Sequence, residues 1–146
     1  YKYYAEDVGL RNARLGFRQF EMTHLMENII YNELLVRGYS VDIGVVYSSE
    51  TDKNKNSVRV PREIDFVINE NGKKTYIQSA YALETEEKKI SELRPFALTE
   101  DSFPKILIRH DVRKRWYDDN GILNIGVIDF LLDDTVIWFY DESVLL

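Results

Sequence analysis

Residues 62–81 read REIDFVINENGKKTYIQSAY and decide the expected fold of this chain. Two runs rich in β-branched and aromatic residues flank Asn71-Gly72, a pair that strongly indicates a two-residue hairpin turn. That turn sets a register in which Asp65 lies opposite Gln78. Residues directly opposed on one face of a sheet have Cβ atoms roughly 4.5–5.5 Å apart. The stretch therefore predicts a hairpin that brings a carboxylate next to an amide.

Helices are expected on both sides of this hairpin. Residues 7–18 are predicted to form a short helix, and residues 21–37 a longer, largely buried one with a broad apolar face. Residues 84–93 are predicted to form a charged helix that is closed by Pro95, because the residue before a proline disfavours the helical conformation.

Further strands are expected around the hairpin. Residues 39–47 and 106–108 have the β-rich pattern of strands, and residues 122–132 read as a strand that runs into a helical turn. Residues 135–140 are predicted to form a last edge strand. The polar residues 48–57 are expected to form a poorly ordered loop, since they contain no apolar anchor. On the hairpin itself, three residues are expected to share one core face: Ile64, Phe66 and Ile68.

These elements predict one α/β domain over residues 1–146, with a mixed β-sheet flanked by helices. A chain of 146 residues with 45% hydrophobic and 30% charged residues is long enough to bury a core. It contains no cysteine, which excludes disulfides and thiolate metal sites. No apolar run reaches the roughly 18 residues of a membrane span, so we expect a soluble, cytoplasmic chain with no membrane partner. Because it opens with Tyr1 instead of Met, an upstream part is expected to be missing.

Nucleic-acid binding would need a local basic patch. The net charge of −6 argues against binding by the whole surface, because phosphate affinity comes from lysine and arginine. Trp116 and Tyr117 follow such a patch directly and offer stacking surfaces. An alternative interpretation is that the patch is solvated surface balanced by nearby acids. The candidate nucleic-acid-binding residues are Arg109, Arg113, Lys114 and Arg115.

A candidate acidic site combines the hairpin with the long helix. Glu27 lies on the mostly apolar side of that helix, and a buried carboxylate needs a partner. We expect Glu27, Asp65 and Gln78 to cluster at the edge of one sheet, where their oxygens could share a cation.

A purely structural network is the alternative. In that interpretation Asp65 pairs with Arg62 or a neighbouring lysine, Gln78 satisfies a backbone group, and Glu27 bonds to Tyr81 or His24. The two interpretations differ in whether the carboxylates are free for a ligand.

Several short stretches, in a specific order and spacing, together carry a family resemblance over nearly the whole chain. They are KYY (2–4), DVGLRN (7–12), HLMENI (24–29), RGY (37–39), EIDF (63–66), YIQSAY (76–81), RP (94–95), PKILI (104–108) and IDFL (128–131). The chain resembles the PD-(D/E)XK nuclease superfamily. It is more closely similar to the domain of unknown function that follows the P-loop domain in many prokaryotic AAA-type ATPases.

The resemblance implies a restriction-endonuclease-like core with a degenerate site. It puts Glu27 and Asp65 at metal-ligand positions and Gln78 at the position of the second-strand acid. Ala80 falls where the nucleases have a lysine. An amide gives Mg²⁺ only a neutral oxygen, and the lost lysine removes charge stabilisation of the transition state. The resemblance therefore implies catalytic positions at Glu27, Asp65 and Gln78 that bind Mg²⁺ only weakly.

The expected function is that of an accessory C-terminal domain that binds nucleic acid or a protein partner for an attached ATPase. No G-x-x-x-x-G-K-[S/T] motif occurs in the sequence, so ATP is expected only on the missing N-terminal domain. The expected partners are that ATPase domain, DNA or another protein, and no cofactor is required. One alternative is an active metal-dependent DNA endonuclease in which Lys88 or Lys89 replaces the missing lysine. Another is a structural or self-association module.

Overall fold

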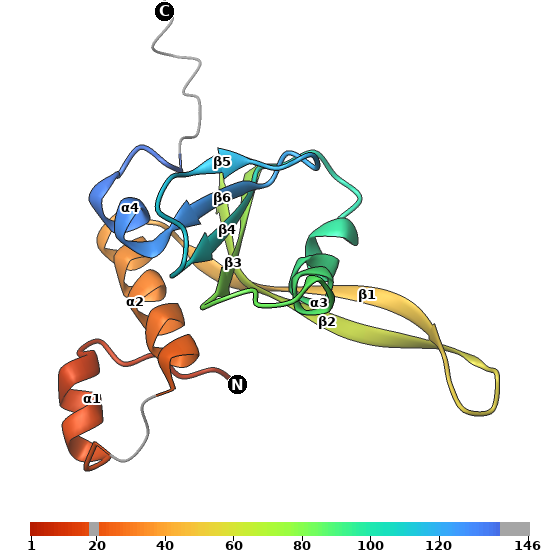
Figure 1. The fold of residues 1–146 in the computed structure, drawn as a ribbon, viewed down its shortest axis with the longest axis horizontal. Coiled ribbons are helices and arrows are strands. Elements are labelled where there is room, and N and C mark those ends of the chain that lie inside the picture. The colour runs from red at the N-terminus through yellow and green to blue at the C-terminus, as the bar shows by residue number, and fades with distance from the viewer. Residues whose placement is uncertain (18–20, 138–146) are drawn as a thin grey trace, which may run out of the picture.

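The computed structural model describes residues 1–17 and 21–137, which form one six-stranded sheet with helices on both faces (Figure 1). The strand order is β1-β2-β3-β4-β6-β5, parallel between β3, β4 and β6 and antiparallel elsewhere. The predicted α/β class with a mixed sheet is therefore confirmed. The elements are α1 (Val8–Arg14), α2 (Met22–Val36), β1 (Val41–Thr51), β2 (Ser57–Glu70), β3 (Lys73–Ala80), α3 (Glu86–Ala97), β4 (Lys105–Arg109), β5 (Trp116–Tyr117), β6 (Leu123–Gly126) and α4 (Val127–Leu132).

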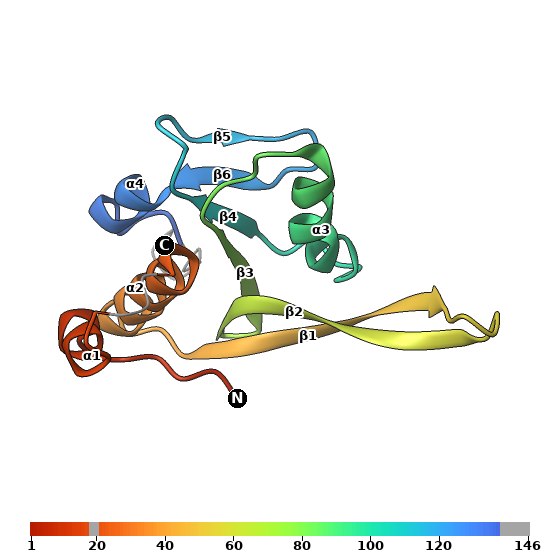
Figure 2. The ribbon, with the colours of Figure 1, turned by 60° about the horizontal axis from the view of Figure 1, so that its bottom comes forward.

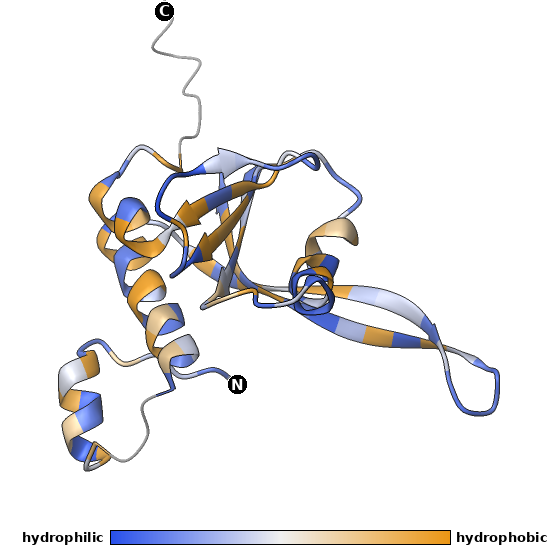
Figure 3. Ribbon diagram, viewed as in Figure 1, coloured by the Kyte–Doolittle hydropathy of each residue, from blue (hydrophilic) through white to orange (hydrophobic). Residues whose placement is uncertain are grey.

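The sheet lies between α2 and α4 on one side and α3 on the other (Figure 2). Two apolar layers hold it there. On one face α2 and α4 pack through Ile30, Leu34 and Phe130 against the sheet, and on the other face α3 packs through Phe96. Figure 3 shows the apolar residues concentrated on β4 and β6 and the polar ones at the far end of the β1–β2 ribbon. Strands covered on both faces read as continuous apolar runs, as the predicted central strand at 106–108 does.

The predicted hairpin is present, with Glu70 opposite Lys73 at the turn and Phe66 opposite Ile77. Toward β1, however, one residue of β1, Ile43, lies opposite two of β2, Asp65 and Phe66, because Asp42 pairs with Val67 and Gly44 pairs with Ile64. Such a β-bulge interrupts the alternation of side chains along a strand.

The bulge makes one prediction about the core wrong. Phe66 and Ile68 share the layer of α2, whereas Ile64 packs with Val67 in the layer of α3. Gly44 lies beneath this irregularity, where an added Cβ would come within 2.8 Å of Val67 and 2.9 Å of Ile64. The bulge therefore turns Ile64 to the other face of the sheet.

The predicted loop at residues 48–57 is also wrong for half of its length, because residues 48–51 and 57 are strand. β1 and β2 run on as a two-stranded ribbon, and only residues 52–56 connect them (Figure 2). The carboxylate of Asp52 accepts hydrogen bonds from the backbone N–H groups of Asn54 and Asn56, at 2.8 and 2.9 Å. Glu50 forms ion pairs with Arg62 and Arg94. Polar side chains thus partner one another across the ribbon instead of forming a loop.

The remaining elements largely follow the prediction. The short and long N-terminal helices and the strand-to-helix segment at 123–132 are present. The charged helix is capped by Thr85 and continues two residues past Pro95, which is buried with Phe96 against the sheet. Residues 135–137 of the predicted last strand are not strand, and 138–140 lie outside the described residues. No helix in the described part of the chain is long and apolar enough to cross a membrane.

Candidate functional site

The structure brings the four residues of the predicted degenerate site together. Glu27, Asp65, Gln78 and Ala80 line one small cavity of about 150 Å³ between α2, α3, the middle of β2 and the C-terminal end of β3. These strands lie inside the sheet of the described residues, so the expected position at a sheet edge is wrong. The other lining residues are Thr23, Ser79, Tyr81, Ala82, Lys88 and Glu92.

Asp65 and Gln78 bond to each other's strand instead of presenting free oxygens to the cavity. The amide oxygen of Gln78 accepts a hydrogen bond from the backbone N–H of Asp65 at 3.2 Å. The carboxylate of Asp65 accepts one from the backbone N–H of Ser79 at 2.8 Å. Both side chains are buried, and together they extend the β2–β3 ladder beyond its last paired residues. One part of the structural alternative is therefore confirmed, since Gln78 satisfies a backbone group.

The partner of Glu27 and Asp65 is Lys2. Its ammonium nitrogen lies 2.8 Å from a carboxylate oxygen of Glu27, 3.1 Å from one of Asp65 and 2.5 Å from one of Glu63. We call these three carboxylates the acidic cluster. Arg62, the alternative partner of Asp65, pairs with Glu50 instead. A lysine amine thus reaches Asp65, but it comes from the start of the chain.

The N-terminal segment, residues 1–6, is fastened along α2 (Figure 1). The amide of Asn28 forms a pair of 2.8 Å hydrogen bonds with the backbone of Ala5, and Asn32 donates to the same carbonyl at 2.9 Å. The Tyr4 ring stacks on Tyr31 with centroids 4.2 Å apart. These contacts fix the chain at Tyr4 and Ala5, two and three residues after Lys2, and so help to direct the Lys2 side chain into the acidic cluster.

Charge and burial shift the proton affinities within the cluster. Burial raises the pKa of Asp65, and the negative charge of Glu27 raises it further. The hydrogen bond from the Ser79 N–H and the positive charge of Lys2 lower this pKa, but they do not outweigh burial. Burial alone would lower the pKa of Lys2, but Glu27, Glu63 and Asp65 outweigh it, so that pKa is raised. The three carboxylates thus raise the pKa of Lys2, whereas burial, reinforced by the charge of Glu27, raises the pKa of Asp65.

Burial also raises the pKa of Tyr4, and so does its hydrogen bond to Glu27 at 2.6 Å. The hydroxyl therefore stays protonated and donates to the carboxylate. His24, the alternative partner of Glu27, approaches it only to 4.0 Å.

The residues do not fit a magnesium ion. Mg²⁺ requires oxygen ligands at about 2.0–2.1 Å in a near-octahedral arrangement. Gln78 gives its oxygen to a backbone N–H, and the oxygens of Glu27 and Asp65 contact an ammonium. Within residues 1–17 and 21–137, no group of three or more His, Cys, Asp or Glu residues is arranged to hold a metal ion. We therefore derive no chemical step through a metal at this site.

Two of the four candidate nucleic-acid-binding residues are tied up in ion pairs. Arg109 binds Asp111 through two hydrogen bonds of 2.8 and 2.7 Å. Arg115 binds Asp129 in the same two-point manner and also reaches Asp133 at 2.8 Å. For these two residues the alternative of a surface balanced by acids is the better description.

The other two, Arg113 and Lys114, are exposed and form no ion pair with any described residue. Trp116 and Tyr117 beside them on β5 are 44% and 72% exposed. Their loop starts at His110, whose ring stacks on Tyr81 of the small cavity with centroids 4.4 Å apart. Two free cations and two aromatic rings therefore lie on one loop and strand that begin at the rim of the acidic site.

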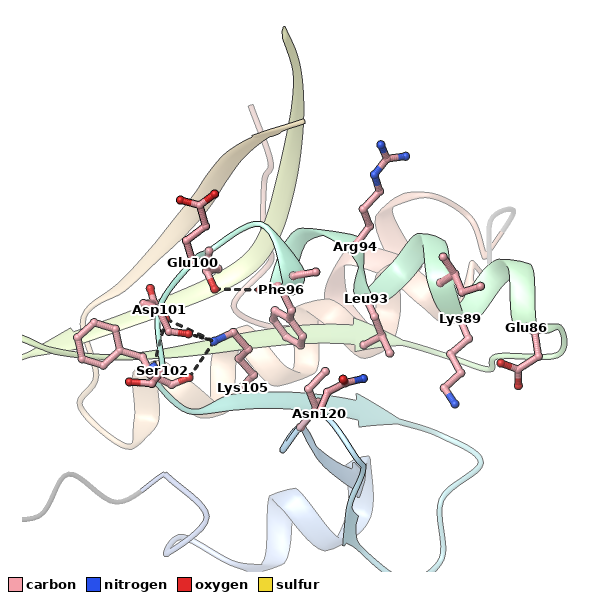
Figure 4. Close-up of a pocket in the computed structure, with 15 residues that line it drawn as sticks. Glu86, Lys89, Leu93, Arg94, Phe96, Glu100, Asp101, Ser102, Lys105 and Asn120 are labelled. Carbon is pink, nitrogen blue, oxygen red and sulfur yellow. Dashed lines mark hydrogen bonds and ion pairs between the residues drawn. The ribbon is translucent and has the colours of Figure 1, made fainter. Parts of the chain in front are cut away.

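A larger hollow, of about 1290 Å³, lies elsewhere and shares no residue with the small cavity. It runs between α3 and the segment that leads into β4 (Figure 4). The side chain of Lys105 points to Asp101 there (Figure 4). Its ammonium donates hydrogen bonds to the backbone carbonyl of Asp101 at 3.0 Å and to that of Phe103 at 3.1 Å. Lys105 thus serves the local fold, and none of Glu27, Asp65, Gln78 and Ala80 lines this hollow.

Sequence reasoning missed Lys2 and Glu63. Lys2 belongs to one of the stretches that carry the resemblance, but no sequence spacing connects it to Asp65, which lies 63 positions away. Glu63 was placed on the hairpin without a role. Only the path of the N-terminal segment across α2 reveals either contact.

No protein-family model matches the chain. An uncharacterized protein of Haemophilus influenzae (strain ATCC 51907 / DSM 11121 / KW20 / Rd) is 32% identical to it over 131 residues. The match covers 90% of this chain but only 28% of that protein. The chain therefore spans about 28% of the length of the curated relative it matches.

Proposed function

We propose that this chain is an accessory domain with a degenerate nuclease-like site, which binds nucleic acid or a protein partner for an attached prokaryotic AAA-type ATPase. The observation that carries the proposal is the contact of Lys2 with both Glu27 and Asp65. In the nuclease superfamily that the sequence resembles, these two positions hold the metal. Here an ammonium lies against both carboxylates, so Mg²⁺ would have to displace it in order to bind them.

Two further positions support a site without catalysis. The oxygen of Gln78 is used by a backbone N–H, and Ala80 is packed in the apolar layer beneath α3. Losing a single preorganised electrostatic group typically reduces an enzymatic rate by about 10²–10³. The absence of both a ligand charge and a lysine at these positions therefore predicts a domain that binds and does not cut.

Nucleic acid is the partner that the surface favours. Arg113 and Lys114 are exposed cations, and Trp116 and Tyr117 are exposed rings on which bases could stack. The attachment to an ATPase rests on the sequence resemblance. The Haemophilus relative is long enough to contain such a domain, since this chain matches only 28% of it.

A cleavage time course with Mg²⁺ or Mn²⁺ tests the proposal. Linear single-stranded and double-stranded DNA are incubated with the wild type, Asp65→Ala and the restored variant Gln78→Glu/Ala80→Lys. We expect the wild type to cut no faster than Asp65→Ala, because both lack a competent metal site.

Each outcome assigns a function. Metal-dependent cutting by the wild type that disappears in Asp65→Ala contradicts the proposal and supports the active endonuclease. Cutting by the restored variant alone supports a decayed site. If none of the three cuts and none binds DNA at low salt, the chain is a protein-binding or self-association module instead.

A further inference from the structure

We propose that Lys2 supplies the acidic cluster with its cation, so that its ammonium takes the place of a divalent metal ion and excludes the metal. This inference rests on the proposed function, because it concerns the same carboxylates. The inference adds one residue, Lys2, to the proposed function, and it adds a mechanism. A cation that belongs to the chain keeps the site free of metal.

The geometry of the cluster suits an ammonium. A lysine ammonium has three N–H donors, and Lys2 has three carboxylate partners, on Glu27, Glu63 and Asp65. Its N–O distances of 2.5, 2.8 and 3.1 Å are those of charge-assisted hydrogen bonds. They exceed the roughly 2.0–2.1 Å of Mg²⁺ ligands and are mostly beyond the roughly 2.3–2.6 Å of Ca²⁺ ligands. A metal ion would have to draw the three carboxylates closer together.

The chain also holds this ammonium in place. The carbonyl and N–H of Ala5 are both bonded to Asn28, and Tyr4 donates its hydroxyl to the same oxygen of Glu27 that Lys2 contacts. A tethered ligand acts at an effective concentration that can reach the millimolar range. A free divalent ion must therefore compete with a cation that is always present at the site.

Lys88 provides a matched control. It lines the small cavity together with Asp65, but it is exposed and forms no ion pair with a described residue. Replacing Lys88 removes the same charge from the neighbourhood of the cluster without removing a contact to the carboxylates. A general effect of net charge on metal affinity would appear in both lysine variants.

The experiment is a titration of the full chain with Mn²⁺ in which free Mn²⁺ is followed by electron paramagnetic resonance. The proteins are the wild type, Lys2→Met, Lys88→Met and Lys2→Met/Asp65→Asn. We expect Lys2→Met to bind Mn²⁺ at least about tenfold more tightly than the wild type and than Lys88→Met, since only it loses the tethered competitor. The double variant should lose that gain.

Equal Mn²⁺ affinity of the wild type and Lys2→Met, whether strong or weak, would overturn the inference, as would an equal gain in Lys88→Met. The titration contains no nucleic acid, so its failure is separate from that of the proposed function. Lys2→Met can gain metal affinity in a chain that binds no DNA, and a DNA-binding chain can fail to show the gain.

A measurement on the wild type covers the case in which Lys2→Met does not fold. Lysine acetylation by a reactive ester is followed by mass spectrometry of peptides that contain Lys2 and Lys88. An amine held by three carboxylates reacts slowly, so Lys2 should be modified at least about tenfold more slowly than exposed Lys88. Equal rates would show that the ammonium is not held in the cluster and would overturn the inference.

Discussion

At the scale of single residues, Tyr4 links the N-terminal segment to the acidic cluster. Its hydroxyl donates to Glu27 at 2.6 Å, and its ring stacks on Tyr31. Tyr4→Phe keeps the ring but removes a hydrogen bond to a partly buried carboxylate, so we expect the free energy of unfolding to fall by about 1–2 kcal/mol. Urea unfolding measures the change. Tyr3→Phe is the control, since Tyr3 is 89% exposed, and an equal loss in both variants would contradict the role of Tyr4.

Asp65 gives the cluster a dependence on pH. Burial raises the pKa of Asp65 in the folded chain above the ordinary value of 3.8, which holds for the unfolded chain. At a pH between these two pKa values, the folded chain therefore binds more protons than the unfolded chain. The stability contributed by this group therefore rises as the pH falls through that window and is lost as the pH rises. We expect the free energy of unfolding of the wild type to rise relative to that of Asp65→Asn as the pH is lowered from neutral through the raised pKa of Asp65, as measured by urea unfolding.

Asp111 provides a control with the opposite sign. Its hydrogen bonds to Arg109 lower the pKa of Asp111, so its contribution is present at neutral pH and is lost as the pH falls. The free energy of unfolding of the wild type should thus fall relative to that of Asp111→Asn as the pH falls. If the difference in unfolding free energy between wild type and variant changed with pH in the same direction for Asp65→Asn and Asp111→Asn, the raised pKa of Asp65 would be wrong.

At the scale of elements, Arg37 joins α2 to α4. Its guanidinium donates to the carbonyls of Phe130 and Asp133, at 2.6 and 3.2 Å, and lies 4.5 Å from the centroid of the Phe130 ring. It also pairs with Glu33 at 2.8 Å, and its side chain is only 7% exposed. The guanidinium thus satisfies carbonyls at the end of α4 that have no partner within the helix.

Removing this guanidinium should be costly. We expect Arg37→Ala to lower the free energy of unfolding by roughly 2–4 kcal/mol, because buried carbonyls and Glu33 lose a charged donor. Thermal or urea unfolding gives the value. Arg113→Ala on the exposed loop should stay within about 0.5 kcal/mol of the wild type. A change of that small size in Arg37→Ala would mean that α4 is held by its apolar contacts alone.

At the scale of the whole molecule, the net charge of −6 confines any nucleic-acid contact to a small surface. Arg113 and Lys114 offer two cations that no described ion pair neutralises, whereas Arg109 and Arg115 are paired with acids. We expect Arg113→Ala/Lys114→Ala to weaken binding of single-stranded DNA. It should also reduce the slope of log K against log salt by about 1.4, or about 0.7 per lost phosphate contact.

Fluorescence anisotropy over a range of salt concentrations measures both quantities. Arg109→Ala is the control, and it should have the smaller effect because its guanidinium already binds Asp111. If Arg109→Ala weakened binding as much as the double variant, the contact surface would lie elsewhere on the molecule.

Much of the fold could be predicted from local patterns. The turn at Asn71-Gly72 fixed the hairpin and its register, and helical periodicity located α2, because both signals depend on neighbouring residues alone. Strand pairing in the folded chain made two other local predictions wrong. The polar residues 48–51 form strand because they pair with residues 57–60 across a ribbon, and Ile64 changes face because β1 and β2 pair with a bulge.

For the site, the hairpin pattern was enough to predict a carboxylate on β2 beside an amide on β3, and the apolar side of α2 showed that its glutamate needs a polar partner. The identity of that partner depends on how residues 1–6 pack on α2. Lys2 reaches Glu27 and Asp65 because residues 1–6 cross α2 and are bound there by Asn28 and Asn32. An ion pair between residues 63 positions apart leaves no periodic trace in a sequence, because it depends on how separate elements pack in space.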